Sequence, residues 1–472
     1  MKMTREEMRR KIDDWYELHL EEMLNDLGKL IAINSVRSVA QNAAPYGLGP
    51  KAALDFVASI LEKRGFDVDI FEDIIITSGI GPKPALMGIL AHLDVVGVDD
   101  GWDTDPFEMV IKDGKIYGRG ATDNKGPSIA AVYAMFCAND LCKDLSNGFQ
   151  LLLGSGEEMG CLDIAQYLEK NTPPPNVFTP DSEYPIVNTE KGRITPFFSA
   201  SWDKDTTLPR IISITGGNTT NVVPNSTEAV IEGYTIEEAE IFCREYSMRS
   251  DTSVSVRSEN NQLIITVEGK SSHAASPHLG ANAQTAMLEL LASMPFAKSS
   301  SFKYICALNR LFPHGDYFGR GLGINMNDSI SGDLTVNFGV LRFSEIDFSG
   351  NFDSRTPICA DAVDLLSMVR SALDLEDISI TNHTHNQSHH TPENSSFVQT
   401  LLGIYELYTG NPRACLCTGG QTYVHEIPGG VAFGTAESGT DNRIHGANEF
   451  MSMEQLLTSA KMFTQTILEI CM

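Results

Sequence analysis

The sequence lacks the features that mark secreted, disulfide-bonded and membrane-spanning proteins. It contains no run of about 18 apolar residues, so we expect no membrane-spanning helix. It begins MKMTREEMRRKIDDWYELH, which is charged and includes no apolar stretch of the kind that directs secretion. The nine cysteines are odd in number and scattered, which does not suit a disulfide framework. We therefore expect a reducing, cytoplasmic compartment.

Basic residues are scarce relative to acidic ones. Lysine and arginine together number 35 against 62 aspartates and glutamates, which gives a net charge of −27. A nucleic-acid-binding protein has the opposite balance, and an anionic membrane surface would repel this chain. We expect neither nucleic acid nor membrane as a partner. The acidity also suits binding of metal cations, although a generally acidic proteome explains it more simply.

Several common catalytic and phosphate-binding motifs are missing as well. There is no G-x-S-x-G for a serine nucleophile and no H-E-x-x-H of the zincin peptidases. The glycine-rich segment GRGATDNKG, residues 118–126, has neither the P-loop spacing nor the pattern G-x-G-x-x-G. The sequence therefore disfavours these two hydrolase classes and a phosphate-binding loop.

The length of 472 residues predicts more than one domain. Alternating strand and helix patterns near the start, such as PALMGILAHLDVV followed by KGPSIAAVYAMFCAND, indicate an α/β layer fold. From about Lys191 the pattern changes to short alternating strands with interspersed helices, typical of an antiparallel α+β domain. The α/β pattern then resumes. We predict one discontinuous α/β domain, residues 1–192 and 387–472, with an α+β domain inserted at residues 193–386.

Polar residues follow several of the predicted α/β strands. Ligands of open α/β sheets bind at the carboxyl ends of the strands, so these side chains are candidates for one site. Two imidazoles with several carboxylates suit two metal ions, and mixed nitrogen and oxygen ligands fit zinc, manganese or cobalt. A further carboxylate could act as a base toward water. The candidates are His92, Asp94, Asp123, Glu157, Glu158, Asp181 and His445.

Each segment alone is a weak signal, but together they resemble a known family. The segments are HLDVV, GRGATDNKG, GSGEEMG, TPDSEYP and IHGANE, in that order along nearly the whole chain. This series resembles the M20 family of metallopeptidases and amidohydrolases. The phrases YGRG and TEKG, with the long insertion, are most similar to its PepV-like dipeptidase branch.

The resemblance implies a fold. The catalytic domain would be a zinc-exopeptidase-like three-layer α/β/α domain, and the insertion an α+β lid, ferredoxin-like and doubled. Dimeric relatives borrow a lid histidine from a partner subunit, and a doubled lid would supply it within one chain. We therefore expect a monomer. In this family the peptide bond after the bridging aspartate is cis, which here is the bond between Asp123 and Asn124.

The resemblance also implies roles at a two-metal centre, with zinc foremost and manganese or cobalt as alternatives. His92 and Asp181 would bind one metal, Glu158 and His445 the other, and Asp123 would bridge them. Glu157 would be the general base that activates a metal-bridging water and then protonates the leaving amine. Asp94 would orient His92 through its other ring nitrogen. The branch often has aspartate where this chain has Asn124.

The insertion offers further candidates by the same resemblance. His273 would donate to the oxyanion of the transition state. Asn221 and Arg355 would hold the C-terminal carboxylate of a small peptide. The planar guanidinium of arginine suits this role because it can donate two parallel hydrogen bonds to a carboxylate. The segment CTGGQTYVHE would line the same pocket through Gly419, Gly420, Thr422 and Tyr423.

Taken together, these features predict a metal-dependent dipeptidase. Its substrate would be a dipeptide or very short peptide with a free carboxylate. One alternative is an N-acyl amino-acid deacylase of the desuccinylase or deacetylase type, with the same two metals. Another is a non-catalytic metal- or peptide-binding protein, against which the presence of Glu157 argues. The histidine-rich segment HTHNQSHHT, residues 383–391, is more simply a connection between domains than a metal site.

Overall fold

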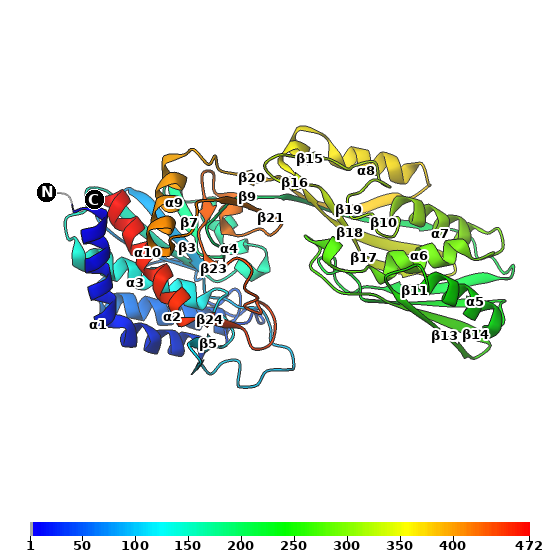
Figure 1. Ribbon diagram of the computed structural model, residues 1–472, viewed down its shortest axis with the longest axis horizontal. Coiled ribbons are helices and arrows are strands. Elements are labelled where there is room, and N and C mark those ends of the chain that lie inside the picture. The colour runs from blue at the N-terminus through cyan, green and yellow to red at the C-terminus, as the bar shows by residue number, and fades with distance from the viewer. Residues whose placement is uncertain (1–2) are drawn as a thin grey trace. The chain divides into compact units, whose positions relative to one another are not determined.

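The computed structural model describes residues 3–472 (Figure 1). The chain forms two compact units. The first runs to Thr189 and resumes over His389–Cys417 and Gln421–Met472, whereas the second comprises Glu190–Ser388 and Thr418–Gly420. The first unit is thus interrupted by the second, and the insertion boundaries 193–386 inferred from sequence stay a prediction. One difference is that Thr418–Gly420 group with the inserted unit, although they lie in the returning part of the chain.

The first unit is built on a nine-stranded mixed sheet. Strands β6, β3, β7 and β22 are neighbours in the sheet and run parallel, so their carboxyl ends meet at one edge. The order is β1 (Asp69–Phe71), β2 (Ile75–Ile80), β6 (Gly148–Gly154), β3 (Ala85–His92), β7 (Asn176–Thr179), β22 (Val431–Ala432), β9 (Ile186–Glu190) and β20 (His389–His390), with β21 (Cys415–Thr418) beside β9.

Both faces of this sheet are covered, which explains why β3 is apolar up to its last residue, His92. Successive side chains of a strand point to opposite faces. Ile89 and Ala91 join a core with residues of the helices α1 (Arg5–Ile31), α2 (Leu48–Lys63), α3 (Lys125–Leu141), α9 (Ser396–Thr409) and α10 (Met453–Cys471). Leu90 joins a second core with residues of α4 (Leu162–Leu168) and of the 3₁₀ turn Tyr423–Glu426. These layers form the predicted α/β/α arrangement.

Smaller sheets position the loops above the carboxyl edge. Strands β4 (Val110–Lys112), β5 (Lys115–Tyr117) and β24 (Phe450–Ser452) form one, in which Phe450 pairs with Tyr117. This pairing holds the segment after His445 beside the segment that leads to Asp123. Strand β8 (Ser182–Glu183) pairs with β23 (Thr435–Ala436) in another.

The second unit contains an eight-stranded antiparallel sheet over a single core. Helices α5 (Ile236–Ser247), α6 (Ala283–Ser293), α7 (Ser300–Leu311) and α8 (Leu365–Asp374) complete it. Eight strands and four helices are twice the number in a four-stranded, two-helix unit, as expected of a doubled lid. The order is β13 (Ser253–Glu259), β14 (Gln262–Glu268), β12 (Ser226–Glu232), β11 (Arg210–Gly216), β17 (Thr335–Phe343), β18 (Asp347–Thr356), β10 (Gly192–Ser201) and β19 (Ser379–Asn386).

One predicted strand is shorter than its sequence suggests. The run GGVAFGT is apolar, but β22 covers only Val431–Ala432. The chain turns at Gly434, which has φ +80° and where an added Cβ would lie 2.2 Å from the Tyr184 ring. Only glycine fits there. Within residues 3–472, no helix is long and apolar enough to cross a membrane.

Candidate active site

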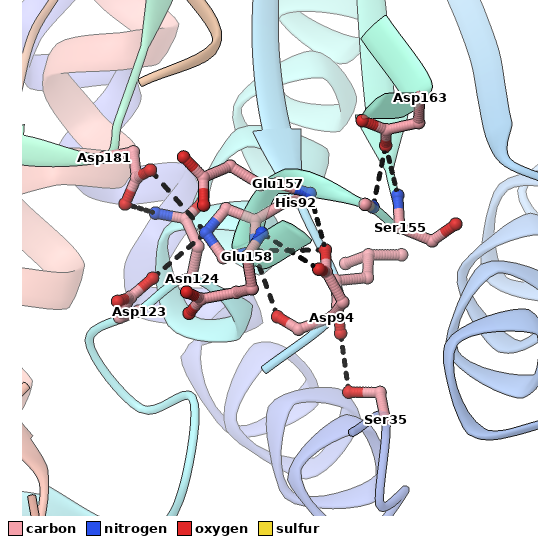
Figure 2. A network of polar contacts seen from close by, with 12 residues as sticks. Ser35, His92, Asp94, Asp123, Asn124, Ser155, Glu157, Glu158, Asp163 and Asp181 are labelled. Atoms are coloured by element: carbon pink, nitrogen blue, oxygen red, sulfur yellow. Dashed lines mark hydrogen bonds and ion pairs between the residues drawn. The ribbon is translucent and has the colours of Figure 1, made fainter. Parts of the chain in front are cut away.

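The side chains predicted to form a metal centre converge at the carboxyl edge of the first unit's sheet. His92 ends β3, and Asp181 lies two positions after the end of β7. Glu157 and Glu158 lie in a 3₁₀ turn that follows β6. Asp123 lies in the turn before α3, and Figure 2 shows how these side chains face one another.

Asp123 lies between the two imidazoles. Its Oδ1 is 3.0 Å from Nε2 of His92, and its Oδ2 is 3.0 Å from Nε2 of His445. On the outer sides, Nε2 of His92 is 3.6 Å from Asp181, and Nε2 of His445 is 3.3 Å from Glu158. The site thus comprises two ligand groups that share one carboxylate: His92, Asp123 and Asp181, and Asp123, Glu158 and His445.

The donor atoms of these groups fit two cations. In each group the nitrogen and oxygen atoms all lie within 4.8 Å of one another. Nε2 of His92 and Oε1 of Glu158 are buried, and their contacts with Asp123 at 3.0 Å and with His445 at 3.3 Å lack good hydrogen-bond geometry, which is costly for polar atoms away from water. A cation would satisfy both, and the mixture of imidazole and carboxylate suits zinc, manganese or cobalt.

The electrostatics of the site also favour cations. Burial, with the charge of Asp123, raises the pKa of Glu158 to about 7. Burial and the charge of Asp181 raise the pKa of Glu157 well above its ordinary value. The carboxylates of Asp123 and then Glu158, which lie beside its Nε2, raise the pKa of His445 to about 11. The carboxylates therefore repel one another, and positive charge stabilises the cluster.

Asp94 lies at the ring nitrogen of His92 that faces away from the ligand groups. Nδ1 of His92 is 3.0 Å from the main-chain oxygen of Asp94 and 3.5 Å from its carboxylate. The carboxylate instead accepts main-chain N–H bonds from Glu157 at 3.3 Å and Glu158 at 3.1 Å. The shorter contact of the imidazole is therefore with the main-chain oxygen of Asp94, and the carboxylate also holds the turn that carries the two glutamates.

Two further features surround Asp123. The peptide bond between Asp123 and Asn124 is cis, as the resemblance implies. The side-chain amide of Asn124 is buried and donates to Asp181 at 3.0 Å and to the Pro180 carbonyl at 3.1 Å. The asparagine that departs from the family pattern is thus a hydrogen-bond donor to a candidate ligand.

Sequence reasoning missed the support of the Asp123 turn. Glu449 is fully buried and accepts N–H bonds from Thr122 at 2.9 Å and from Asp123 at 3.0 Å. Its other oxygen accepts a bond of 2.7 Å from the buried Arg119. The sequence did offer a sign of this pair, since Arg119 lies in the motif GRGATDNKG and Glu449 in the motif IHGANE.

Within the second unit, the segments that carry the predicted substrate residues contact one another. The Asn221 carbonyl accepts the Ala274 N–H at 2.9 Å, and a β-bridge joins Val222 to His273. Arg355 is buried in β18 and donates to the Gly419 carbonyl. An added Cβ on Gly419 would lie 2.7 Å from Cβ of Ala275.

The segment expected to line one pocket is divided between the units. Gly419 and Gly420 group with the second unit, whereas Thr422 and Tyr423 group with the first. Thr422 is 7% exposed and precedes the 3₁₀ turn. Tyr423 is fully buried, and its hydroxyl donates to Asp163 at 2.6 Å. Tyr423 is therefore a buried side chain that packs against the His92 ring and not an exposed residue of a pocket.

The histidine-rich segment is a connection between the units. His383 and His385 lie exposed on β19, whereas His389 is 2.8 Å from the Gly430 carbonyl and His390 is 2.9 Å from Thr189. Among the described residues, the ligand groups with metal-binding spacing do not include this segment.

Comparison with known proteins agrees with this geometry. A model of the peptidase family M20/M25/M40 matches residues 88–469. A Beta-Ala-Xaa dipeptidase of Lactobacillus delbrueckii subsp. lactis is 31% identical over 462 residues, covering 96% of this chain and 97% of the relative. The match therefore extends over both units.

Two solved structures share the fold. Human carnosine dipeptidase 1 aligns with a TM-score of 0.59 and 15% identity, covering 98% of each chain. The aminoacylhistidine dipeptidase of Vibrio alginolyticus aligns with a TM-score of 0.59 and 15% identity, covering 95% of this chain and 96% of its own. Since the family model spans most of the sequence, the chain belongs to peptidase family M20/M25/M40 and is a hydrolase.

Proposed function

We propose that this enzyme hydrolyses dipeptides or very short peptides with a free C-terminal carboxylate, using two divalent cations. The observation that carries the proposal is Asp123, whose two oxygens each lie 3.0 Å from a different imidazole. A shared carboxylate is what two neighbouring metals require. The relative named a Beta-Ala-Xaa dipeptidase supports the dipeptide substrate.

The proposal assigns five residues to the cations. His92 and Asp181 would hold one, His445 and Glu158 the other, and Asp123 both. Zinc is the first choice, with manganese and cobalt as alternatives, because the donors are imidazole nitrogen and carboxylate oxygen. When bound, the cations would polarise the scissile carbonyl and lower the pKa of the attacking water.

Glu157 is the proposed general base. Its carboxylate lies near His92 and Glu158. It is not a member of either ligand group that contains Asp123, so it is not needed as a ligand of the two cations. Burial and the charge of Asp181 raise its pKa, which makes it a better proton acceptor than an ordinary carboxylate. Glu157 would take a proton from the attacking water and pass it to the leaving amine.

The second unit would recognise the substrate. Asp353 accepts bonds from Nε and Nη2 of Arg355, at 2.7 and 3.3 Å, and Gly419 accepts from Nη1. One N–H on each Nη atom is then left for a carboxylate. Asn221 would assist Arg355, His273 would donate to the oxyanion, and Gly420 and Thr422 would complete the pocket.

The decisive experiment is a substrate panel with zinc, manganese and cobalt. Ala-Ala and β-Ala-Xaa dipeptides should be hydrolysed, and N-acetyl-alanine should not. Glu157→Gln should abolish turnover while retaining metal, whereas the exposed control Glu169→Gln should leave turnover unchanged. Activity confined to N-acetyl-alanine would instead support the deacylase. Metal binding without turnover of any substrate would support a binding protein.

We also propose a monomer that acts in the cytoplasm. The support is the second unit, whose eight strands amount to a doubled lid within one chain. Size-exclusion chromatography with light scattering should give a mass near 51.6 kDa. A mass twice as large would contradict the proposal.

A further inference from the structure

The turn that carries Glu157 and Glu158 is held from behind by two buried carboxylates. Four consecutive main-chain N–H groups, those of residues 155–158, donate to them. Asp94 accepts the N–H groups of Glu157 and Glu158, whereas Asp163 accepts those of Ser155 and Gly156 (Figure 2). A main chain held at four successive residues cannot rotate freely. The Cα atoms of Glu157 and Glu158, from which the two side chains extend, are therefore held in place.

Asp163 makes the shorter of these bonds. Its Oδ2 accepts the N–H of Ser155 at 2.7 Å and that of Gly156 at 2.8 Å. The same oxygen accepts the Tyr423 hydroxyl at 2.6 Å, and Oδ1 accepts the N–H of Ile164 at 2.8 Å. The carboxylate is fully buried, where hydrogen bonds to a charged acceptor are strongest.

The glycines of the turn make room for this carboxylate. An added Cβ on Gly154 would lie 2.3 Å from Oδ2 of Asp163 and 2.1 Å from the Tyr423 hydroxyl oxygen. On Gly156 it would lie 3.1 Å from Cγ of Asp163. The pattern G-S-G before the two glutamates is thus what allows Asp163 to reach the main chain.

Tyr423 connects this support to the metal-site candidates. Its ring lies edge-on to the His92 imidazole, with centroids 6.2 Å apart and planes at 89°. Its hydroxyl lies on Asp163, so one buried side chain contacts both the support of the glutamate turn and a candidate ligand from β3. Neither Asp163 nor Tyr423 belongs to any of the candidate ligand groups.

We propose that Asp163 and Tyr423 are positioning residues, which hold the turn 155–158 so that Glu157 and Glu158 stay in place beside His92 and Asp123. This proposal rests on the proposed function. It explains two buried polar groups that the chemistry itself does not use.

The test uses the full-length, metal-loaded enzyme. Tyr423→Phe removes one hydroxyl and keeps the ring, and Asp163→Asn keeps the shape and one oxygen. Each should lower kcat roughly 10- to 100-fold with little change in KM, as loss of outer support around metal sites does. The matched control is Tyr167→Phe, a tyrosine of the same buried cluster, which should leave kcat unchanged.

A second readout does not depend on turnover. The visible absorption spectrum of the cobalt(II)-loaded protein reports the ligand arrangement, and it should change in Tyr423→Phe and stay unchanged in Tyr167→Phe. The double variant Asp163→Asn/Tyr423→Phe should be no worse than Asp163→Asn, because both changes break one hydrogen-bonded pair.

The outcomes separate the two proposals. If the wild-type enzyme hydrolyses no dipeptide, the proposed function fails, and the cobalt spectra still decide the positioning role. If dipeptides are hydrolysed but Tyr423→Phe matches Tyr167→Phe in kcat and in spectrum, the positioning role is overturned. A loss of thermal stability with unchanged kcat and spectrum would equally overturn it, since that is what a purely structural pair would show.

Discussion

The side-chain amide of Asn124 donates a hydrogen bond to the carboxylate of Asp181, 3.0 Å away. It also donates to the Pro180 carbonyl, so both of its N–H groups face acceptors at the end of β7. An aspartate at this position could not donate both bonds. The amide therefore fixes the orientation of a carboxylate that we assign to a metal.

Replacing Asn124 should weaken metal binding. In Asn124→Ala, Asp181 loses its donor, and the affinity for the cation held by His92 and Asp181 should fall roughly 10- to 100-fold. Titration with zinc in a competing chelator measures this affinity. The exposed Asn42→Ala is the matched control and should bind metal like the wild type. Equal affinities in both variants would show that Asp181 needs no such donor.

Removing the metals should destabilise the first unit and abolish activity. Without cations, buried carboxylates face one another around Asp123, and burial with the charge of Asp123 already raises the pKa of Glu158 to about 7. Dialysis against a chelator should therefore lower the unfolding temperature, and added zinc, manganese or cobalt should restore it. A metal bound only by the folded state at 100 times its Kd adds about 2.7 kcal/mol to stability. An unfolding temperature that chelation leaves unchanged would contradict a two-metal site.

Much of the site could be predicted from sequence because each candidate follows its own strand. His92 ends β3, Glu157 follows β6 and Asp181 follows β7. Parallel neighbours in a sheet bring their carboxyl ends together, so strand ends known from local patterns give a site. The structure groups His92 with Glu157 and Glu158, and also with Asp123 and Asp181, with their ligand atoms within 4.8 Å in each group.

The support behind the ligands could not be predicted in the same way. Tyr423 and Asp163 are 260 positions apart, and their hydrogen bond depends on how the 3₁₀ turn at Tyr423 packs on α4. Local sequence patterns carry no information about such pairs. The carboxylate of Asp94 shows the same limit, because its partners are main-chain N–H groups, which every residue but proline possesses.

The buried ion pair of Arg119 and Glu449 should be essential for stability. Glu449→Gln leaves the Arg119 guanidinium buried without a counter-charge, which costs about 3–5 kcal/mol in comparable buried pairs. Denaturant unfolding measures the loss. The exposed pair of Arg413 and Glu406 offers the control, because Glu406→Gln should cost no more than about 1 kcal/mol. Similar losses in the two variants would mean that Arg119 finds another partner.

The stability of the first unit should depend on pH through Asp163. Burial, with the charge of Asp94, raises the pKa of Asp163 from 3.8 to about 6. The folded protein then holds this proton more tightly than the unfolded chain does. The resulting stabilisation is complete below pH 3.8 and is lost as the pH rises through about 6.

Comparison of the wild type with Asp163→Asn isolates this contribution. Between pH 4 and 7, in a chelator, the free energy of unfolding of the wild type should fall relative to the variant. The two-unit difference in pKa limits the fall to about 3 kcal/mol. A difference between the two proteins that does not vary with pH would show that Asp163 titrates at its ordinary value in the fold.

Arg355 should determine affinity for the substrate's carboxylate. Asp353 engages its Nε and Nη2, at 2.7 and 3.3 Å, which fixes the plane of the guanidinium. Lysine keeps the charge but cannot hold Asp353 and a carboxylate in two parallel pairs. In Arg355→Lys, KM for Ala-Ala should therefore rise at least about tenfold, which corresponds to about 1.4 kcal/mol of lost binding. Turnover of Ala-Ala-amide, which has no carboxylate, should be the same in both enzymes. The exposed Arg257→Lys is the matched control, and an equal rise in KM for the amide would mean that Arg355 acts on the fold and not on the carboxylate.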